Sequence, residues 1–363
     1  MADPTLRTLP ALAAAGLLDA ERAAALAPVA ERYAVAVTPA MAALMDGSDP
    51  ADPMARQFLP DLAELTLAPE ELADPIGDEE KSPLPGLIHR YPDRVLLKVT
   101  HACAVYCRFC FRREVVGPGG EPPLTGEALA RVADYTAERP AIWEVILSGG
   151  DPLVLSPRRL ADILAALEPI DHVKVIRLHT RVPAVDPAAV TEALVATLKS
   201  TSKTLYVALH ANHPRELTPA ARAACAKLID AGIPMVSQTV LLKGVNDDPD
   251  VLGALMRGFV ETRIKPYHLN FTDLAPGTGH FRVSLAEAQE IMRALRGRYS
   301  GLCQPTLILD IPGGHGKSPV GPNYLSPDLA EITDPWGGAH PVAGFQSVKS
   351  RSQAEPSPFP EAL

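Results

Sequence analysis

Three closely spaced cysteines are the residues of this chain best suited to hold a metal centre. Cys103, Cys107 and Cys110 follow the pattern C-x3-C-x2-C, directly after the apolar run 95–99. Structural zinc takes four protein ligands and iron–sulfur clusters usually take four cysteines, so one ligand is missing here. A 4Fe–4S cluster held by three cysteines leaves one iron open, which is what catalysis requires. Two alternatives remain: a zinc site completed by a distant histidine, and cysteines that only pack as small apolar residues.

Lys317 is the second candidate for chemistry, because it lies in the glycine-rich stretch 312–318, Pro-Gly-Gly-His-Gly-Lys-Ser. A lysine amine held close to a ligand can form a Schiff base with pyridoxal phosphate. The alternative is an exposed lysine without a role. The stretch does not match the phosphate loop G-x-x-x-x-G-K-[ST], which argues against an ATP site. We interpret His210 and His213 as core histidines, since no carboxylate has a spacing that would complete a metal site with them.

The segments around these residues alternate between apolar runs and amphipathic helical patterns. Helix starts are indicated at Thr125, at Asp186 before Pro187, at Thr218 and at the capping box that begins at Ser284. Strands that are apolar throughout indicate a parallel sheet that is covered by helices on both faces. The predicted strands are 95–99, 143–147, 173–178, 204–209, 235–242, 267–271 and 306–309. Units of this length predict an α/β fold, a partial (βα)6-type, open, TIM-like barrel.

The polar motifs all follow the ends of these predicted strands. Active sites of β/α barrels gather at the carboxyl ends of the strands, so the motifs are expected on one rim. The cysteines follow the first strand, Ser148-Gly149-Gly150-Asp151 the second, His179-Thr180-Arg181 the third, and His210 the fourth; Gln238 lies on the fifth, Asp273 follows the sixth, and Asp310 with Lys317 follows the last. Read alone, the Ser-Gly-Gly-Asp stretch could equally be an ordinary tight turn.

Composition limits the class of protein. The formal net charge is −9 and no long basic run occurs, which argues against a nucleic-acid partner. No apolar run is long enough to span a bilayer, no signal peptide is visible, and the number of cysteines is odd, at 5. We therefore expect a cytoplasmic protein without disulfides and without a membrane partner.

We divide the 363 residues into three parts. Residues 1–82 are expected to form a helical N-terminal region, with helical patterns at 9–27, 39–45 and 60–72. Residues 83–325 form the predicted barrel, and Arg90-Tyr91-Pro92-Asp93-Arg94 is interpreted as a turn before its first strand. Residues 326–363 are expected to be a loop followed by a disordered tail rich in Ser, Pro and Glu.

The cysteine motif resembles that of the radical S-adenosylmethionine enzymes. With the glycine-rich lysine and Arg90-Tyr91-Pro92-Asp93-Arg94, the chain resembles the lysine 2,3-aminomutase family from about residue 84 to residue 324. Two features depart from the better-known clostridial members: the cysteine-rich C-terminal zinc segment is missing, and Phe109 stands where those enzymes carry His. The compact length and cysteine motif are similar to the branch that makes (R)-β-lysine for elongation factor P, whereas the stretch from Asp310 is closer to the free-lysine enzymes.

The resemblance implies a role for each matching residue. Cys103, Cys107 and Cys110 would hold the 4Fe–4S cluster, and Lys317 would be the catalytic lysine that carries pyridoxal phosphate. Arg112, Asp273 and Asp310 would bind the substrate, Arg112 at its carboxylate and the two acids at its ε-ammonium. The remaining cofactor-binding residues would be Arg90, Tyr91 and Arg94 near pyridoxal phosphate, and Ser148, Gly149, Gly150, Asp151, Arg181 and Gln238 near S-adenosyl-L-methionine.

The activity implied by the resemblance is a radical migration of the amino group that converts L-lysine to β-lysine. The expected partners are L-lysine, reduced flavodoxin or ferredoxin as electron donor, and a second copy of the chain in a dimer. Alternative activities are the elongation factor P branch and arginine or glutamate 2,3-aminomutase; glutamate would bring a third carboxylate against Asp273 and Asp310. From a different class, a non-catalytic iron–sulfur or zinc protein on a barrel scaffold remains an alternative.

Overall fold

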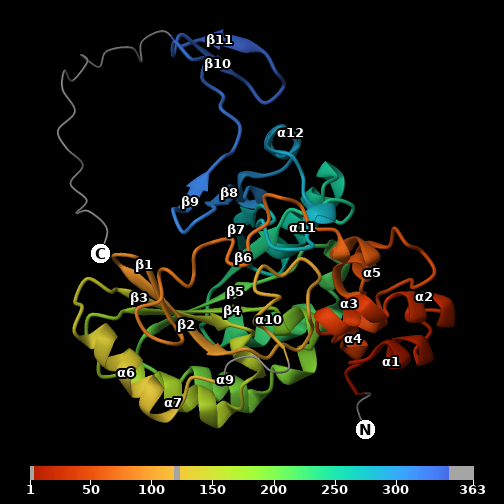
Figure 1. Cartoon of the computed structure of the whole chain (residues 1–363). Helices are drawn as coiled ribbons and strands as arrows, with labels where there is room; N and C mark the ends of the chain where they lie inside the picture. Colours follow the sequence, from red (N-terminus) through yellow and green to blue (C-terminus); the bar gives the residue numbers. More distant parts are fainter. Residues whose placement is uncertain (1–3, 118–122, 343–363) are drawn as a thin grey trace. The chain divides into compact units, whose positions relative to one another are not determined.

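A sheet of nine strands in the order β1 to β9 organises the chain, shown by a computed structural model that describes residues 4–117 and 123–342 (Figure 1). Strands β2 to β8 pair in parallel, whereas β1 and β9 pair antiparallel at the two ends. The strands are β1 Leu87–Tyr91, β2 Arg94–Thr100, β3 Glu144–Gly149, β4 Val175–Thr180, β5 Thr204–Leu209, β6 Met235–Val240, β7 Ile264–Asn270, β8 Thr306–Ile311 and β9 Gly316–Pro319. The predicted strands are all confirmed, and in the described chain β1 and β9 do not pair, so the barrel is open as expected.

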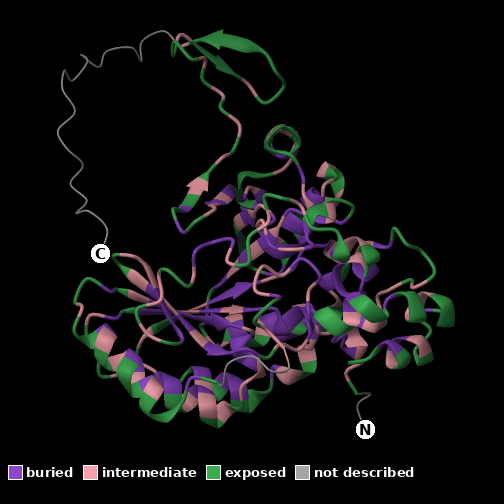
Figure 2. Cartoon of the chain, in the orientation of Figure 1, coloured by how far each residue is buried: buried purple, intermediate pink, exposed green. Residues whose placement is uncertain are grey.

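Helices follow the parallel strands and cover the outside of the sheet, with their apolar faces inward (Figure 2). They are α6 Gly126–Ala137, α7 Pro157–Leu167, α8 Val182–Val185, α9 Glu192–Leu198, α10 Pro219–Asp230, α11 Pro249–Glu261 and α12 Leu285–Arg298. The predicted starts at Thr125, Thr218 and Ser284 are confirmed. The start at Asp186 is wrong: only a short 3-10 turn follows it, and α9 begins after Thr191, whose hydroxyl accepts a hydrogen bond from a backbone N–H inside the helix.

The N-terminal region consists of short helices that share one apolar core with the barrel. They are α1 Leu9–Ala14, α2 Ala20–Ala25, α3 Ala27–Arg32, α4 Pro39–Ala42, α5 Pro53–Phe58 and the 3-10 turn η1 Leu62–Leu65. The helical pattern over 9–27 is interrupted, because Gly16 takes a left-handed φ of 73° just after α1. The helix expected over 60–72 is reduced to η1, and α5 was not predicted.

The chain forms two compact units, one that ends at Gly321 and a second that begins at Pro322. Within the second unit, β10 Glu331–Thr333 and β11 Ala339–Pro341 pair antiparallel, so the loop expected there contains a small hairpin. The disordered tail was predicted for residues 350–363, which lie outside the described residues.

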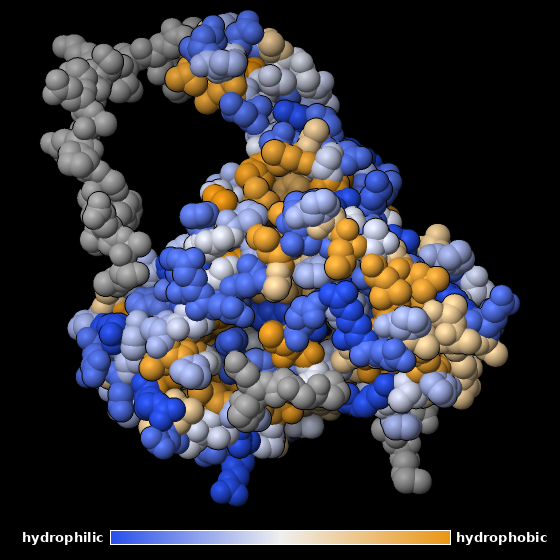
Figure 3. Space-filling model, viewed as in Figure 1, coloured by the Kyte–Doolittle hydropathy of each residue, from blue (hydrophilic) through white to orange (hydrophobic). Residues whose placement is uncertain are grey.

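The surface of the first unit mixes polar and apolar side chains on the face seen in Figure 3. Large apolar residues exposed in the N-terminal region include Leu62, Leu67 and Leu72. Isolated apolar side chains of this kind are normal on protein surfaces. Among the described residues, no helix has the length and apolar character needed to cross a membrane.

Candidate active site

All residues that the sequence singled out for the site line one cavity of about 430 Å³. They are Arg90, Tyr91, Arg94, Cys103, Cys107, Cys110, Arg112, Ser148, Gly149, Gly150, Asp151, Arg181, Gln238, Asp273, Asp310 and Lys317. The cavity extends from the loops after the parallel strands down to Arg94 and Glu144, which are the first residues of β2 and β3. The sequence therefore predicted correctly that these motifs come together, although their separate roles remain predictions.

The three cysteines lie in the loop that follows β2, and each has a free thiol. Burial and the neighbouring groups raise the pKa of Cys103 well above its usual value and that of Cys110 to about 11. These thiols therefore stay protonated near neutral pH until a metal centre displaces the protons. Among the described residues, no three His, Cys, Asp or Glu side chains converge as ligands of one metal ion. Each cysteine of a cluster binds a different iron atom, so the three cysteines of this loop would hold a cluster without converging on one ion.

The N-terminal region holds the cysteine loop through backbone hydrogen bonds. The N–H of Tyr106 donates to the carbonyl of Ala36 at 3.1 Å, and the N–H of Arg108 donates to the carbonyl of Gln57 at 2.9 Å. Both donors lie within the cysteine motif, and both acceptors belong to the segment between α3 and η1. The N-terminal region thus positions the candidate cluster ligands, a role that its sequence did not indicate.

A buried ionic cluster strengthens the same contact. Glu64, at the end of η1 and fully buried, accepts hydrogen bonds from the Nε of Arg108 at 2.9 Å and from the guanidinium of Arg113. The ring of Tyr33 lies 3.5 Å from the Arg113 guanidinium carbon. Removing one partner of a buried ion pair such as Glu64–Arg113 strongly destabilises a protein, because the remaining partner becomes a buried charge without compensation.

The Ser-Gly-Gly-Asp stretch packs directly against the first residues of the cysteine loop. Gly149 has a φ of 104°, and a Cβ on Gly150 would lie 2.2 Å from the carbonyl oxygen of Ala102, so both positions require glycine. The Asp151 carboxylate accepts hydrogen bonds from the Thr180 hydroxyl at 2.6 Å and from the backbone N–H of Arg181 at 2.7 Å. Asp151 therefore joins the loops after β3 and β4, and its carboxylate is already occupied by donors of the chain.

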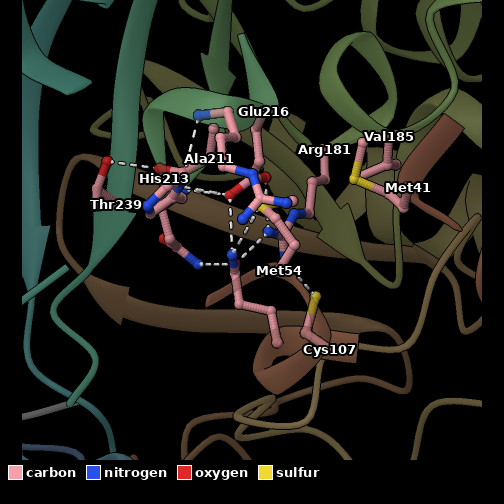
Figure 4. A network of polar contacts seen from close by, with 12 residues as sticks. Met41, Met54, Cys107, Arg181, Val185, Ala211, His213, Glu216 and Thr239 are labelled. Atoms are coloured by element: carbon pink, nitrogen blue, oxygen red, sulfur yellow. Dashed lines mark hydrogen bonds and ion pairs between the residues drawn. The ribbon is translucent and has the colours of Figure 1, made fainter. Parts of the chain in front are cut away.

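Arg181 connects the loop after β4 to the cysteines (Figure 4). Its Nη1 donates to the sulfur of Cys107 at 2.8 Å, and its Nη2 donates to Glu216 at 2.7 Å. Both Arg181 and Glu216 are buried. The sequence placed Arg181 on the rim, but nothing near Glu216 in the sequence indicated that it would reach this site.

Lys317 lines the same cavity from the antiparallel strand β9. The stretch Pro312 to His315 closes a hairpin between β8 and β9, in which Asp310 and Lys317 are direct partners. The Nζ of Lys317 lies 2.8 Å from an oxygen of Asp310, and its backbone N–H donates to the hydroxyl of Tyr91 at 2.8 Å. This hairpin explains why a lysine seven residues after an aspartate can face it.

Asp78, which the sequence analysis did not single out, joins two arginines of the site. Its carboxylate lies 2.8 Å from Arg112 and 3.1 Å from Arg90, and Arg90 also contacts Asp310 at 3.2 Å. Asp78 lines the same cavity. No local motif marks this residue, because its partners lie elsewhere in the chain.

Asp273 has a raised pKa. Burial raises its pKa to about 7, although the ammonium group of Lys317 opposes this shift. Its carboxylate oxygens have no hydrogen bond or ion pair with the described residues. Among the other residues that line the cavity, the Nε2 of His179 and the Oδ1 of Asn270 are buried and without a partner in the described chain. Unpaired polar atoms of this kind are expected where a polar ligand binds.

Comparisons with known proteins agree with this geometry. The radical SAM superfamily model matches residues 97–252. An L-lysine 2,3-aminomutase of Clostridium subterminale is 41% identical over 308 residues, which cover 85% of this chain and 74% of that protein. The chain belongs to the lysine 2,3-aminomutase family. Another L-lysine 2,3-aminomutase, from Acetoanaerobium sticklandii, is 43% identical over 291 residues, covering 80% of this chain and 70% of that protein.

Another relative is named for a different substrate. A glutamate 2,3-aminomutase of Clostridioides difficile is 37% identical over 297 residues, covering 82% of this chain and 70% of that protein. Radical SAM membership implies a 4Fe–4S cluster and S-adenosylmethionine, which agrees with the three cysteines on the cavity wall. Membership in the aminomutase family identifies the reaction class, and the choice of substrate depends on the side chains of the cavity.

Proposed function

We propose that this protein is a lysine 2,3-aminomutase that converts L-lysine to β-lysine. The observation that carries the proposal is that three cysteines, a lysine and two carboxylates share one cavity. Cys103, Cys107 and Cys110 would hold the cluster, and Lys317 would hold pyridoxal phosphate. When bound, the cluster with S-adenosylmethionine supplies the radical that removes a substrate hydrogen, and pyridoxal phosphate carries the migrating amine.

Asp310 and Asp273 would recognise the ε-ammonium group of lysine. In the structure, Asp310 already accepts a primary ammonium, that of Lys317, at 2.8 Å. If Lys317 holds pyridoxal phosphate, Asp310 would be available to accept a substrate ammonium instead. The ammonium group of Lys317 also acts on Asp273, since its positive charge lowers the pKa of that carboxyl group. Two acids in a buried cavity favour a cationic substrate over glutamate.

Arg112 would bind the substrate carboxylate with Asp78 holding it in place. Asp78 accepts from the Nε and the Nη2 of Arg112 at 3.0 and 2.8 Å, so one nitrogen of the guanidinium remains free for a ligand. Arg90, Tyr91 and Arg94 would surround pyridoxal phosphate. Tyr91 fixes the backbone of Lys317 by its hydroxyl group, and the guanidinium carbon of Arg94 lies 3.8 Å from the centre of the Tyr91 ring.

S-adenosylmethionine would bind between the cysteines and the loops after the next strands. Ser148, Gly149 and Gly150 line that wall, and the glycines let the first residues of the cysteine loop pack against it. Gln238, from β6, and Arg181 complete it. The electron donor, which we expect to be reduced flavodoxin or ferredoxin, and the dimer remain predictions.

An anaerobic activity assay tests the proposal. The cluster is reconstituted, and lysine, arginine and glutamate are each incubated with S-adenosylmethionine, pyridoxal phosphate and a one-electron reductant. We expect β-lysine as the main product, and chiral analysis of it distinguishes the elongation factor P branch from the free-lysine enzymes. A β-amino acid formed only from arginine or glutamate would reassign the substrate, and no product from any of the three would refute the aminomutase activity.

Two lysine variants test the cofactor assignment. Lys317→Ala should lose the visible absorbance of bound pyridoxal phosphate while keeping iron, because the cysteines do not depend on it. Lys243→Ala, at an exposed lysine outside the cavity, is the matched control and should keep both. Retained pyridoxal absorbance in Lys317→Ala, resistant to dialysis, would show that another amine carries the cofactor.

A further inference from the structure

Arg181 reaches a sulfur of the cysteine loop from a separate part of the barrel. It is the first residue after β4, and its Nη1 lies 2.8 Å from the Sγ of Cys107. The side chain is only 5% exposed, so water does not screen this contact effectively. Figure 4 shows the guanidinium between Cys107 on one side and Glu216 on the other.

The guanidinium is fixed in this position by four groups. Its Nη2 donates to the Oε1 of Gln57 at 2.6 Å and to Glu216 at 2.7 Å. Its carbon lies 4.5 Å from the ring centre of Phe58 and 5.7 Å from that of Phe109. Rings at these distances attract a cation without competing for its hydrogens. The contact with Cys107 is therefore the result of a built arrangement that leaves the guanidinium little freedom.

Glu216 is itself held rigidly. Its Oε1 accepts from the backbone N–H groups of Asn212 at 2.8 Å and His213 at 3.0 Å, and the side chain is fully buried. The carboxylate partly compensates the charge of Arg181 on the side away from the sulfur. Removing this negative charge should make the field of Arg181 at Cys107 more positive, whereas removing Arg181 should have the opposite effect.

A positive hydrogen-bond donor at a cluster ligand acts on the cluster's reduction. Reduction adds one electron, so the reduced cluster carries one more negative charge than the oxidised cluster. Hydrogen bonds to the sulfurs and nearby charge are among the factors that set cluster potentials. In a buried site the attraction between this added charge and a cation is much larger than in water.

We propose that Arg181 is a positioning residue that raises the reduction potential of the cluster through its hydrogen bond to Cys107, with Glu216 limiting the increase. This proposal rests on the cluster assigned under the proposed function, but it needs neither lysine nor pyridoxal phosphate. It extends the expected role of Arg181, which the family resemblance placed only near S-adenosylmethionine. It also gives a role to Gln57 and Glu216, which have no place in the proposed chemistry.

A potentiometric titration of the reconstituted cluster tests the proposal. Dithionite supplies one electron per cluster through redox mediators, without S-adenosylmethionine, and the reduced cluster is followed by its paramagnetic resonance signal. Arg181→Gln should make reduction at least tenfold less favourable, which corresponds to a midpoint lower by about 59 mV. Arg177→Gln is the matched control: this arginine lies on β4 and lines the same cavity, but it pairs with Glu144 and should leave the midpoint unchanged.

Glu216→Gln should shift the midpoint potential of the cluster in the opposite direction. Its midpoint should rise above that of the unmodified protein, since Arg181 loses its compensating charge. Midpoints that stay unchanged in both variants, or that move in the same direction, would overturn the proposal, because a general loosening of the site has no preferred sign. If Arg181→Gln does not retain iron, Glu216→Gln alone decides, and a midpoint at or below the original value refutes the role. A failed aminomutase assay would leave this result valid, since only the cluster is titrated.

Discussion

The part of the cavity around the three cysteines, the cysteine end, and the part around Lys317, the Lys317 end, are built in different ways. At the cysteine end, charged side chains are buried and have partners within the chain: Glu64 binds two arginines, and Arg181 binds Glu216 and a sulfur. At the Lys317 end, the lysine side chain is 37% exposed, and Asp273 has no partner among the described side chains. The charges at the cysteine end are paired within the chain, whereas the Asp273 carboxylate at the Lys317 end has no charged partner among the described residues.

This difference indicates which parts of the site must be fixed before the reaction and which must respond to the ligand. A metal centre needs ligands that are positioned by surrounding contacts, and networks of satisfied polar groups provide such rigidity. A substrate site instead needs groups whose charge the substrate completes, and a carboxyl group with a raised pKa is a group of this kind. The N-terminal region contributes mainly to the cysteine end, where the ligands of the metal centre are held in position.

The largest expected effect is the loss of a cysteine. Cys107→Ser should lose most of the iron and all detectable activity, because an alcohol at this position is a poor ligand for iron. Iron content and the visible absorbance of the reconstituted protein measure the effect. Cys225→Ala removes a buried thiol of α10 outside the cavity and should retain iron. Equal iron in the two variants would contradict the assignment of the cluster.

The next effect concerns the rigidity of the cysteine end. Glu64→Gln should lower the free energy of unfolding by about 3 kcal/mol, because Arg108 and Arg113 become buried charges without an acid partner. Urea unfolding of the metal-free protein measures this loss. The control Glu290→Gln removes an acid that is 71% exposed and paired with Arg293, and it should change stability by less than about 1 kcal/mol. Similar values for both variants would show that Glu64 does not hold the loop.

The sequence predicted the strands and the location of the site because these depend on local patterns. Apolar runs identified the parallel strands, and the cysteine motif, the Ser-Gly-Gly-Asp stretch and the glycine-rich lysine each mark themselves by short spacing. The edge strands β1 and β9 were missed, because they are short and contain polar residues such as Arg90 and Lys317. Asp78, Glu64 and Glu216 were missed for another reason: each binds residues that are distant in the chain, and no periodicity marks such pairs.

A pH-dependent effect on substrate binding tests the Lys317 end. Since the pKa of Asp273 is raised to about 7, the carboxyl group is mostly neutral below that pH and cannot pair with an ammonium group. The KM for lysine should therefore fall as the pH increases from about 6 to about 8. In Asp273→Asn this dependence should disappear, and KM at pH 8 should rise about tenfold, the effect of losing about 1.4 kcal/mol of binding. The same pH dependence in both proteins would assign the titration to another group.

The stability of the metal-free protein checks this interpretation without any activity measurement. A carboxyl group with a raised pKa in the folded state keeps its proton where the unfolded chain has already lost it, so folding becomes less favourable as the pH rises from about 4 to about 7. The cost is about 1.4 kcal/mol for each unit of the shift. Asp273→Asn removes the cost, and the variant should gain more stability, relative to the original protein, at pH 8 than at pH 5. Asp250→Asn, at an exposed acid on α11, is the control and should show no such difference between the two pH values. An equal gain at both pH values for Asp273→Asn would mean that the buried carboxyl group ionises normally, and that both ends of the cavity are electrostatically complete before the substrate arrives.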